Sequence, residues 1–379
     1  MSNPFEYGVA VTGASFCNRV QELADLKVAM ENSERLFLYS ERRLGKTSLV
    51  LRVLKNLDRE QFVAAYVDLW ATDNELSFAT ATAKGISQAM GTTADRVLET
   101  ATKFFSRLAP SVALDDEGKP KVSFGLNQAS EPATQDLTDV LRVPARIAEE
   151  SNRKVVIVFD EIQRILEYEN DHIERLLRSI IQQQNKVAYV FLGSRKHLIQ
   201  EMFLNRSRPL YRSAGHYPLG PISEEHWLPF IREKFESEGK QISDLVIARI
   251  CELTEGHPFY TQHLSHALWE RCERGQEVTM DSIKQGVQIL LARENYTYSA
   301  LWESLAMNQR RLLRGLAVEG KHALPYSAAF AQKYGIGTSS SVQRAVTGLV
   351  RRDLVDREDR SLIISDRFFR IWIQEREDQ

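Results

Sequence analysis

A chain of 379 residues is longer than one hydrophobic core usually organises, so two or three domains are expected. With 43% hydrophobic and 26% charged residues, the composition is that of a globular protein and excludes the disordered and fibrous classes. A formal net charge of -2 argues against nucleic-acid binding through overall basicity, and leaves room only for a local basic patch.

The cysteines and the hydrophobic runs set the expected compartment. Cys17, Cys251 and Cys272 lie far apart with no Cys-x-x-Cys pair, which excludes the usual local zinc spacings and a dense disulfide framework. The N-terminal residues lack the basic start and apolar run of a signal peptide, and no 18 consecutive residues are apolar. We therefore expect a cytoplasmic protein without a membrane segment.

The first half of the chain alternates short apolar runs with helical stretches. The apolar runs end in small or acidic residues, as strands buried on both faces of a parallel sheet do. Expected strands cover 35–40, 61–70, 154–161, 187–194 and 216–223, and expected helices cover 45–57, 76–90, 94–107, 134–151 and 172–184. This order predicts an α/β fold with a parallel sheet covered on both sides. Residues 114–126 indicate a turn and a short strand inserted at the periphery of the sheet.

The pattern of the second half is helical. It predicts helices throughout 223–295, with a break at "EGHPF" (255–259). From residue 300 several short helices, a helix over 339–355 and a strand pair around "DREDRS" indicate a winged helix-turn-helix. The expected domains are thus a core (1–222), a helical domain (223–299) and a winged helix (300–379).

Residues 40–50, "SERRLGKTSLV", resemble a phosphate-binding loop between a strand and a helix. In such a loop Gly45 allows a tight backbone, Lys46 reaches the β- and γ-phosphates, and the Thr47 hydroxyl is available to Mg²⁺. Ser40 stands where the first glycine is expected. A strand-like φ suits a serine there, so we expect the loop to bind nucleotide.

A second acidic signal follows the apolar run "VVIVF". Asp160 at the end of this strand is placed to hold the Mg²⁺ shell, and Glu161 to polarise water. The chain lacks the Asn-Lys-x-Asp motif that reads guanine, so ATP is the expected nucleotide. The two signals together predict a Mg²⁺-dependent ATP site.

Further polar residues are candidates at this site. Ser194 ends the next strand, where it either senses the γ-phosphate or simply terminates the strand. Arg206, Arg208 and Arg212 are candidate arginine fingers, acting in cis or across a subunit interface, and solvated surface arginines are the alternative. Arg42 and Arg43 lie in the loop, where they either meet phosphates or clamp a neighbouring domain.

With these residues in view, the chain resembles the archaeal-type ATPases, a P-loop family allied to the AAA+ and STAND classes. The resemblance runs nearly end to end and rests on "FCNRVQEL", "RRLGKTSL", "YVDLW", "VFDEIQRI", "FLGSRKHLIQEMF", "RPLYRSA", "GHPFYTQHL" and "SDRFFRIWI". It implies a five-stranded parallel AAA+-like core, a helical lid and a C-terminal winged helix. The departure is Ser40, where the family commonly has glycine, and it bears on nucleotide affinity.

The resemblance also implies roles for individual residues. It implies phosphate and Mg²⁺ contacts by Lys46 and Thr47, roles for Asp160 and Glu161 at metal and water, and a sensor role for Ser194. The residues expected to contact nucleotide are Arg42, Arg43, Leu44, Gly45, Lys46, Thr47, Ser48 and the lid motif Gly256, His257 and Pro258. The residues expected in catalysis are Lys46, Glu161, Ser194 and Arg212, and the expected metal ligands are Thr47 and Asp160.

Two functions remain open for such an ATPase. In the first, the winged helix binds DNA through one face of helix 339–355. The polar residues of that face are Ser340, Gln343, Arg344, Thr347 and Arg351, and the wing adds Arg357 and Arg360. The opposite face carries the apolar residues Val342, Val346, Leu349 and Val350. In the second, a slowly hydrolysing STAND-type switch binds a protein partner. The acidic wing residues Asp353, Asp356, Glu358 and Asp359 fit the second at least as well. A homo-oligomer is compatible with both.

Two remaining groups of residues are expected to bind neither a metal nor a base. His257, His263 and His266 lack carboxylate or cysteine partners at metal spacing and are expected to be structural or lid residues. Phe368, Phe369 and Trp372 fall at helical spacing and are expected to close the core of the winged helix rather than to stack on bases.

Overall fold

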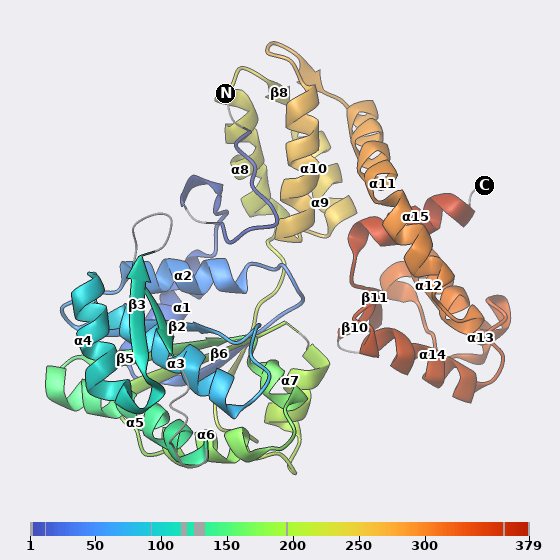
Figure 1. Cartoon of the computed structure of the whole chain (residues 1–379). Helices are drawn as coiled ribbons and strands as arrows, with labels where there is room; N and C mark the ends of the chain where they lie inside the picture. Colours follow the sequence, from blue (N-terminus) through green and yellow to red (C-terminus); the bar gives the residue numbers. More distant parts are fainter. Residues whose placement is uncertain are drawn as a thin grey trace. The chain divides into compact units, whose positions relative to one another are not determined.

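The computed structural model of the chain describes residues 3–11, 13–91, 93–114, 120–124, 133–194, 196–358 and 361–377. By their contacts, these residues form two compact units (Figure 1). One unit comprises residues 19–42 and 46–219. The other comprises residues 1–18, 43–45 and 220–379, so three residues of the expected phosphate loop belong with the C-terminal half.

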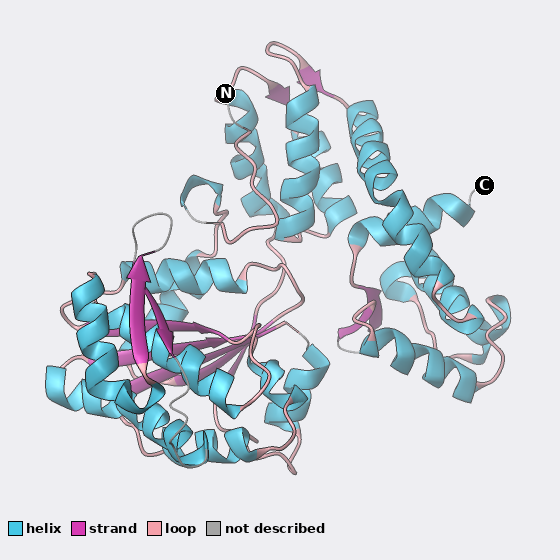
Figure 2. Cartoon of the chain, viewed as in Figure 1, coloured by secondary structure: helices cyan, strands magenta, loops and turns pink. Residues whose placement is uncertain are grey.

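A five-stranded parallel sheet forms the centre of the first unit, as the sequence predicts (Figure 2). Its strand order is β2-β5-β6-β1-β7, with bounds β1 Arg35–Tyr39, β2 Phe62–Asp68, β5 Lys154–Asp160, β6 Val187–Gly193 and β7 Gly215–Pro218. The central β6 is buried along its whole length, because side chains of both faces are covered. Parallel pairing brings the carboxyl ends of β1, β5 and β6 to one edge of the sheet.

Helices cover both faces of this sheet. Figure 1 shows α1 and α2 on one side and α5 and α6 on the other, and α3 packs against both β2 and α5. Their bounds are α1 Val20–Glu31, α2 Lys46–Asn56, α3 Glu75–Met90, α5 Ala133–Ser151, α6 His172–Ile181 and α7 Lys196–Leu204. Aromatic side chains of the strands, including Phe159, Tyr189 and Phe191, stack in the core between the layers.

The insertion beside this core differs from the prediction. The sequence indicates one short strand in 114–126, whereas the structure has an antiparallel pair, β3 (Pro110–Leu114) and β4 (Pro120–Phe124). The helix expected over 94–107 ends earlier, as α4 (Ala94–Phe105) followed by a short 3-10 turn. Val97 and Ala101 of α4 pack on Val122 of β4 in a small core of their own. Residues 110–114 alternate too weakly in polarity to be recognised as a strand without their partner.

The helical part of the second unit contains α8 (Glu224–Glu236), α9 (Asp244–Thr254), α10 (Pro258–Arg271) and α11 (Met280–Glu303). The prediction of helices throughout is wrong at two places, where β8 (Gln241–Ile242) and β9 (Glu277–Val278) form a short parallel pair. Two-residue strands lack a recognisable period in sequence, since they exist only through their pairing. The N-terminal segment joins this part: Phe5 is buried, and the Glu6 N–H donates to Gln262 Oε1.

The last part of the chain is a winged helix. It consists of α12 (Met307–Glu319), α13 (Ala328–Lys333), α14 (Ser339–Arg351), the antiparallel strands β10 (Val355–Glu358) and β11 (Ser361–Ile364), and α15 (Arg367–Glu377). The helix expected over 339–355 ends at Arg351, because Asp353 takes a positive φ of 55° and the chain turns into β10. Among the described residues, no helix is long and apolar enough to cross a membrane.

Candidate functional site

The loop after β1 carries the first group of candidate residues. Gly45 has a φ of 90°, a backbone conformation that favours glycine, and the space where its Cβ would lie is open. Arg43 also has a positive φ of 62°, whereas Ser40 does not. Helix α2 begins at Lys46, so the N–H groups of its first turn point toward the loop. The local geometry is that of a loop that presents backbone donors to an anion.

Lys46 is held inside this loop. Its ammonium group donates to Ser40 Oγ at 2.7 Å, to the Glu41 carbonyl at 2.9 Å and to the Ser40 carbonyl at 3.4 Å, and the side chain is buried. The Ser40 hydroxyl in turn donates to the Glu41 carbonyl at 2.7 Å. The residue that departs from the family pattern therefore contacts the residue that would bind phosphate. Leu44 and Ser48 are also buried, and Arg42 is exposed.

The second group comprises Thr47 in the first turn of α2, Tyr66 near the end of β2 and Asp160 at the end of β5. Thr47 Oγ1 donates to Asp160 Oδ2 at 2.8 Å, although 113 residues separate them. The Tyr66 hydroxyl donates to the same oxygen at 2.6 Å. Burial and the neighbouring Asp160 raise the pKa of Tyr66 well above its usual range, so its hydroxyl remains a donor. The hydroxyl of Thr47 and the carboxylate of Asp160 are hard oxygen donors of the kind that Mg²⁺ prefers, so they fit this cation.

Glu161 lies next to this pair but faces other partners. Its φ of 54° turns the chain out of β5, and its carboxylate accepts hydrogen bonds from Ser194 Oγ at 2.8 and 3.0 Å. Gln163 Nε2 also donates to it from a buried position on a short 3-10 helix, Ile162–Glu167. The structure thus brings together Glu161 and Ser194, as expected, and adds Gln163. Gln163 is not among the residues predicted from the sequence, although its place two residues after the glutamate was an available signal.

The arginines separate into different environments. Arg208 forms an ion pair with the buried Glu174, so it is held by the core rather than presented to a ligand. Arg206 and Arg212 are exposed, and Arg212 combines a positive φ of 52° with a guanidinium placed over the Tyr211 ring. Of the three candidate arginine fingers, Arg208 is thereby accounted for structurally. Arg43 lies with its guanidinium 4.3 Å from the centre of the Phe259 ring.

The lid motif is packed tightly within the C-terminal unit. Gly256 has a φ of 64°, and a Cβ there would meet the Ile222 carbonyl oxygen at 2.2 Å, so no other residue fits without a shift. The Gly256 carbonyl accepts from Trp227 Nε1 at 3.1 Å and from the Ile222 N–H at 3.1 Å. His257 is buried, and Pro258 is the first residue of α10.

The residue before this motif joins it to the last helix. Glu255 forms ion pairs with Arg367, at 3.0 Å, and with Arg370. Burial opposes its ionisation, but the charges of Arg370 and Arg367 outweigh it and lower the pKa of Glu255. The Tyr260 ring of α10 also meets Phe368 edge-on. Helix α15 is therefore anchored directly beside the lid motif.

The histidines of α10 and the aromatic residues of α15 pack against other side chains of the C-terminal unit. His263 stacks on Tyr7, and burial and neighbouring cations lower its pKa to about 4. No group of three His, Cys, Asp or Glu residues with metal-binding geometry occurs among the residues that the structure describes. Phe368, Phe369 and Trp372 are buried in the core shared by α11, α12 and α15, as expected.

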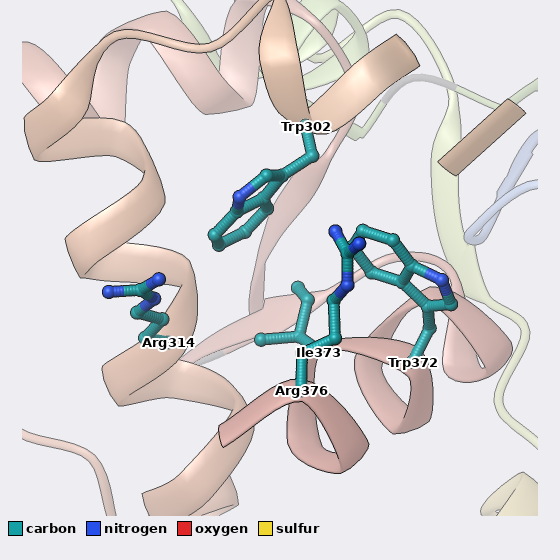
Figure 3. A pocket seen from close by; sticks show the side chains of 5 residues that line it. All are labelled: Trp302, Arg314, Trp372, Ile373 and Arg376. Carbon is teal, nitrogen blue, oxygen red and sulfur yellow. The ribbon is translucent and has the colours of Figure 1, made fainter. Parts of the chain in front are cut away.

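A small cavity of about 180 Å³ lies at the edge of this core (Figure 3). Trp302, Arg314, Trp372, Ile373 and Arg376 line it. Arg376 lies over the Trp372 ring at 4.3 Å, and Arg314 lies 5.6 Å from the Trp302 ring. The two guanidinium groups therefore cover indole faces instead of leaving them open for a stacked base.

The exposed face of α14 keeps the polarity predicted from the sequence. Ser340, Gln343, Arg344, Thr347 and Arg351 are exposed, whereas Val342, Val346 and Leu349 are buried. Val350 is half-buried. In the wing, Arg357 is exposed, and Arg360 lies outside the described residues.

Comparisons with known proteins agree with this architecture. A family model described as an ATPase domain predominantly from Archaea matches residues 16–264, and one described as a probable winged helix domain matches residues 296–375. An uncharacterised protein of Methanocaldococcus jannaschii is 22% identical over 306 residues, or 78% of this chain. The chain spans about half of that curated relative, 55% of its length.

Two solved structures share the fold over nearly the whole chain. A Walker-type ATPase of Pyrococcus abyssi superposes with a TM-score of 0.65 and 17% identity, covering 95% of this chain and 96% of that one. The ORC2 protein of Aeropyrum pernix, solved in ADPNP–ADP complexes, gives a TM-score of 0.55 and 14% identity, covering 99% and 100%. The match confirms the predicted α/β core and C-terminal winged helix.

Proposed function

Because this chain belongs to the family of ATPase domains found predominantly in Archaea, we propose that it binds ATP with Mg²⁺ and hydrolyses it to gate a conformational change. The observation that carries this proposal is the hydrogen bond between Thr47 and Asp160 at the carboxyl edge of the sheet. It joins the first residues of a phosphate-loop helix to an acidic strand end, the pairing that a nucleotide-bound Mg²⁺ requires.

Each residue of the proposed nucleotide site then has a role. The N–H groups of the loop and Lys46 bind the phosphates, with Arg42, Arg43, Leu44, Gly45 and Ser48 completing the loop. Thr47 and Asp160 hold Mg²⁺, which neutralises charge that develops on the phosphates. The lid residues Gly256, His257 and Pro258 complete the proposed nucleotide-contacting set.

Glu161 polarises the attacking water in this scheme. A carboxylate oxygen must be free to accept a proton or a hydrogen bond from that water. The Ser194 hydroxyl lies within hydrogen-bond distance of both Glu161 oxygens, and Gln163 Nε2 is a second donor to this carboxylate. We therefore assign to Ser194 a sensor role, in which its hydroxyl leaves Glu161 for the γ-phosphate and releases the base.

Arg212 is the proposed arginine finger. Arg208 is bound to Glu174, whereas Arg212 is exposed on the same loop and carries a charge that solvent can reach. An arginine of this kind stabilises charge on the transferring phosphoryl group, in cis or from a second subunit of a homo-oligomer.

We further propose that the winged helix binds duplex DNA through α14. What supports this is the row of exposed hydrogen-bonding and cationic side chains on one face of that helix. A STAND-type switch with a protein partner is the second candidate, and it is favoured by the acidic side chain of Asp356 in the wing beside Arg357.

Steady-state ATP hydrolysis with and without duplex DNA tests both levels of the proposal. We expect DNA-stimulated turnover that is lost in Lys46→Ala and in Glu161→Gln. Tight ATP binding with slow turnover that DNA does not change would support the protein-partner switch instead. An absence of ATP binding by the wild-type protein would refute the ATPase assignment.

The DNA surface has a direct test with a charge-matched control. Arg344→Ala with Arg351→Ala should weaken duplex binding and reduce the slope of log K against log salt by about two, since each lost phosphate contact removes about 0.9. Arg249→Ala with Lys284→Ala removes the same charge from α9 and α11 and should leave the slope unchanged. Equal effects of the two pairs would remove α14 from the DNA interface.

A further inference from the structure

We propose that Tyr66 is a positioning residue for the Mg²⁺ site, whose hydroxyl holds the Asp160 carboxylate in the orientation that the cation needs. This inference rests on the proposed ATP and Mg²⁺ site. Tyr66 is the first residue of the "YVDLW" stretch (66–70).

The register of the sheet explains why Tyr66 reaches this carboxylate. Strands β2 and β5 are parallel neighbours in which Tyr66 pairs with Val158 and Asp68 pairs with Asp160. Side chains two residues apart lie on one face of a sheet, so Tyr66 stands one step behind Asp160 on the same face. A tyrosine ring pointing along the strand spans that step, and its hydroxyl meets Asp160 Oδ2 at 2.6 Å.

Hydrogen bonds fix both oxygens of the carboxylate. Oδ1 accepts from the Glu161 N–H at 2.8 Å, and Oδ2 accepts from Thr47 at 2.8 Å as well as from Tyr66. Thr47 is itself a proposed metal ligand, so its hydroxyl would also coordinate the cation. Tyr66 donates to Asp160 but is not a proposed metal ligand.

The backbone of Tyr66 is itself held in place. Gly85 of α3 lies so close that an added Cβ would meet the Tyr66 carbonyl oxygen at 2.7 Å. Helix α3 therefore packs directly on β2 at this residue and restricts its movement. A donor mounted on a fixed backbone sets the direction of the carboxylate that accepts from it.

The hydrogen bond from Tyr66 affects Mg²⁺ binding in two opposite ways, and we expect its effect on the orientation of the Asp160 carboxylate to be the larger. Donation to Oδ2 reduces the electron density available to a cation, which opposes binding. Mg²⁺, however, demands near-ideal octahedral geometry, so a carboxylate free to rotate binds it poorly. Loss of an outer partner of a metal ligand typically costs about ten-fold or more in metal affinity.

The test is a Mg²⁺ titration of nucleotide binding to the full chain. Binding of the non-hydrolysable analogue AMP-PNP is measured by calorimetry at increasing Mg²⁺ and again in EDTA. We expect Tyr66→Phe to need about ten-fold more Mg²⁺ for half-maximal binding. Its binding of AMP-PNP in EDTA should equal that of the control.

The matched control is Tyr168→Phe. Tyr168 is another half-buried tyrosine of the same unit, whose hydroxyl donates to Thr72 Oγ1 at 2.5 Å, so this variant also loses one phenolic hydrogen bond. It should keep the wild-type Mg²⁺ dependence. If Tyr66→Phe and Tyr168→Phe require the same Mg²⁺ as the wild type, Tyr66 has no positioning role.

The titration also separates the inference from the function on which it rests. A wild-type protein whose binding depends on Mg²⁺, together with an unaffected Tyr66→Phe, would overturn the inference alone. A wild-type protein that binds no nucleotide, or binds it equally in EDTA, would overturn both the proposed site and the role of Tyr66.

Discussion

Replacing Ser40 by the glycine that the family commonly carries should strengthen ATP binding. Ser40 is fully buried, and its Oγ accepts a 2.7 Å hydrogen bond from the Lys46 ammonium group. An ammonium group has three donors, and that of Lys46 lies within hydrogen-bond distance of three acceptors on Ser40 and Glu41. Lys46 must release at least two of these bonds to reach two phosphate groups.

The magnitude follows from the one bond that the substitution removes. A hydrogen bond to a charged group contributes about 1.5–3 kcal/mol net. In Ser40→Gly the bond to Oγ is already absent before ATP arrives, so binding no longer has to break it. Water can satisfy part of the freed donor, which favours the lower end of the range. We therefore expect binding tighter by about 1.5 kcal/mol, or about ten-fold in Kd.

The assay is calorimetric titration of AMP-PNP into the wild type, Ser40→Gly and Ser40→Ala at saturating Mg²⁺. Ser40→Ala removes the hydroxyl without adding backbone freedom, so it should reproduce the gain. A gain in Ser40→Gly alone would point to loop flexibility instead of the lost hydrogen bond. Unchanged or weaker binding in both variants would show that Ser40 supports Lys46 rather than competing for it.

Three other outcomes follow from the same structure. Gln163→Ala removes a donor to Glu161 and should raise ATP turnover roughly three- to ten-fold; a lower turnover would mean that Gln163 holds Glu161 in its active orientation. Burial raises the pKa of Glu174 from 4.5 to about 7. The stability that protonated Glu174 contributes is therefore present below pH 4.5 and is lost as pH rises through 7. Glu174→Gln should flatten the pH dependence of the unfolding free energy, measured by urea unfolding, over this range. Glu255→Gln removes the carboxylate that pairs with the buried Arg367. It should lower the unfolding free energy, measured by denaturant unfolding, by about 3–5 kcal/mol. A decrease of less than about 1 kcal/mol would contradict this expectation.

Much of the fold of the α/β core can be predicted from the sequence, because the residue patterns that indicate it are local. Strands β5 and β6 contain continuous apolar runs; β5 ends at Asp160, and β6 is followed directly by Ser194. The glycine before Lys46 identifies the loop, since its positive φ is a property of that one position. Such signals predict the parallel sheet, the phosphate loop and the acidic strand end.

Other features have no local signal. The β8–β9 pair joins residues 241–242 to 277–278, and the β3–β4 pair joins residues 110–114 to 120–124, which alternate little in polarity. Each of these strands gains its hydrogen bonds only from a partner elsewhere in the chain. A sequence pattern reports the burial of a segment, but it does not report which other segment pairs with it.

The sequence by itself determined which chemical groups this protein has at its sheet edge: Lys46, Thr47, Asp160, Glu161 and Ser194. The tertiary structure decided how those groups are used. It placed Ser40 in a hydrogen bond with Lys46, Ser194 in a hydrogen bond with Glu161, and Tyr66 in a hydrogen bond with Asp160, 94 residues away in the chain. The physical reason is that hydrogen-bond partners depend on strand register and side-chain direction, which are fixed only when the sheet is assembled.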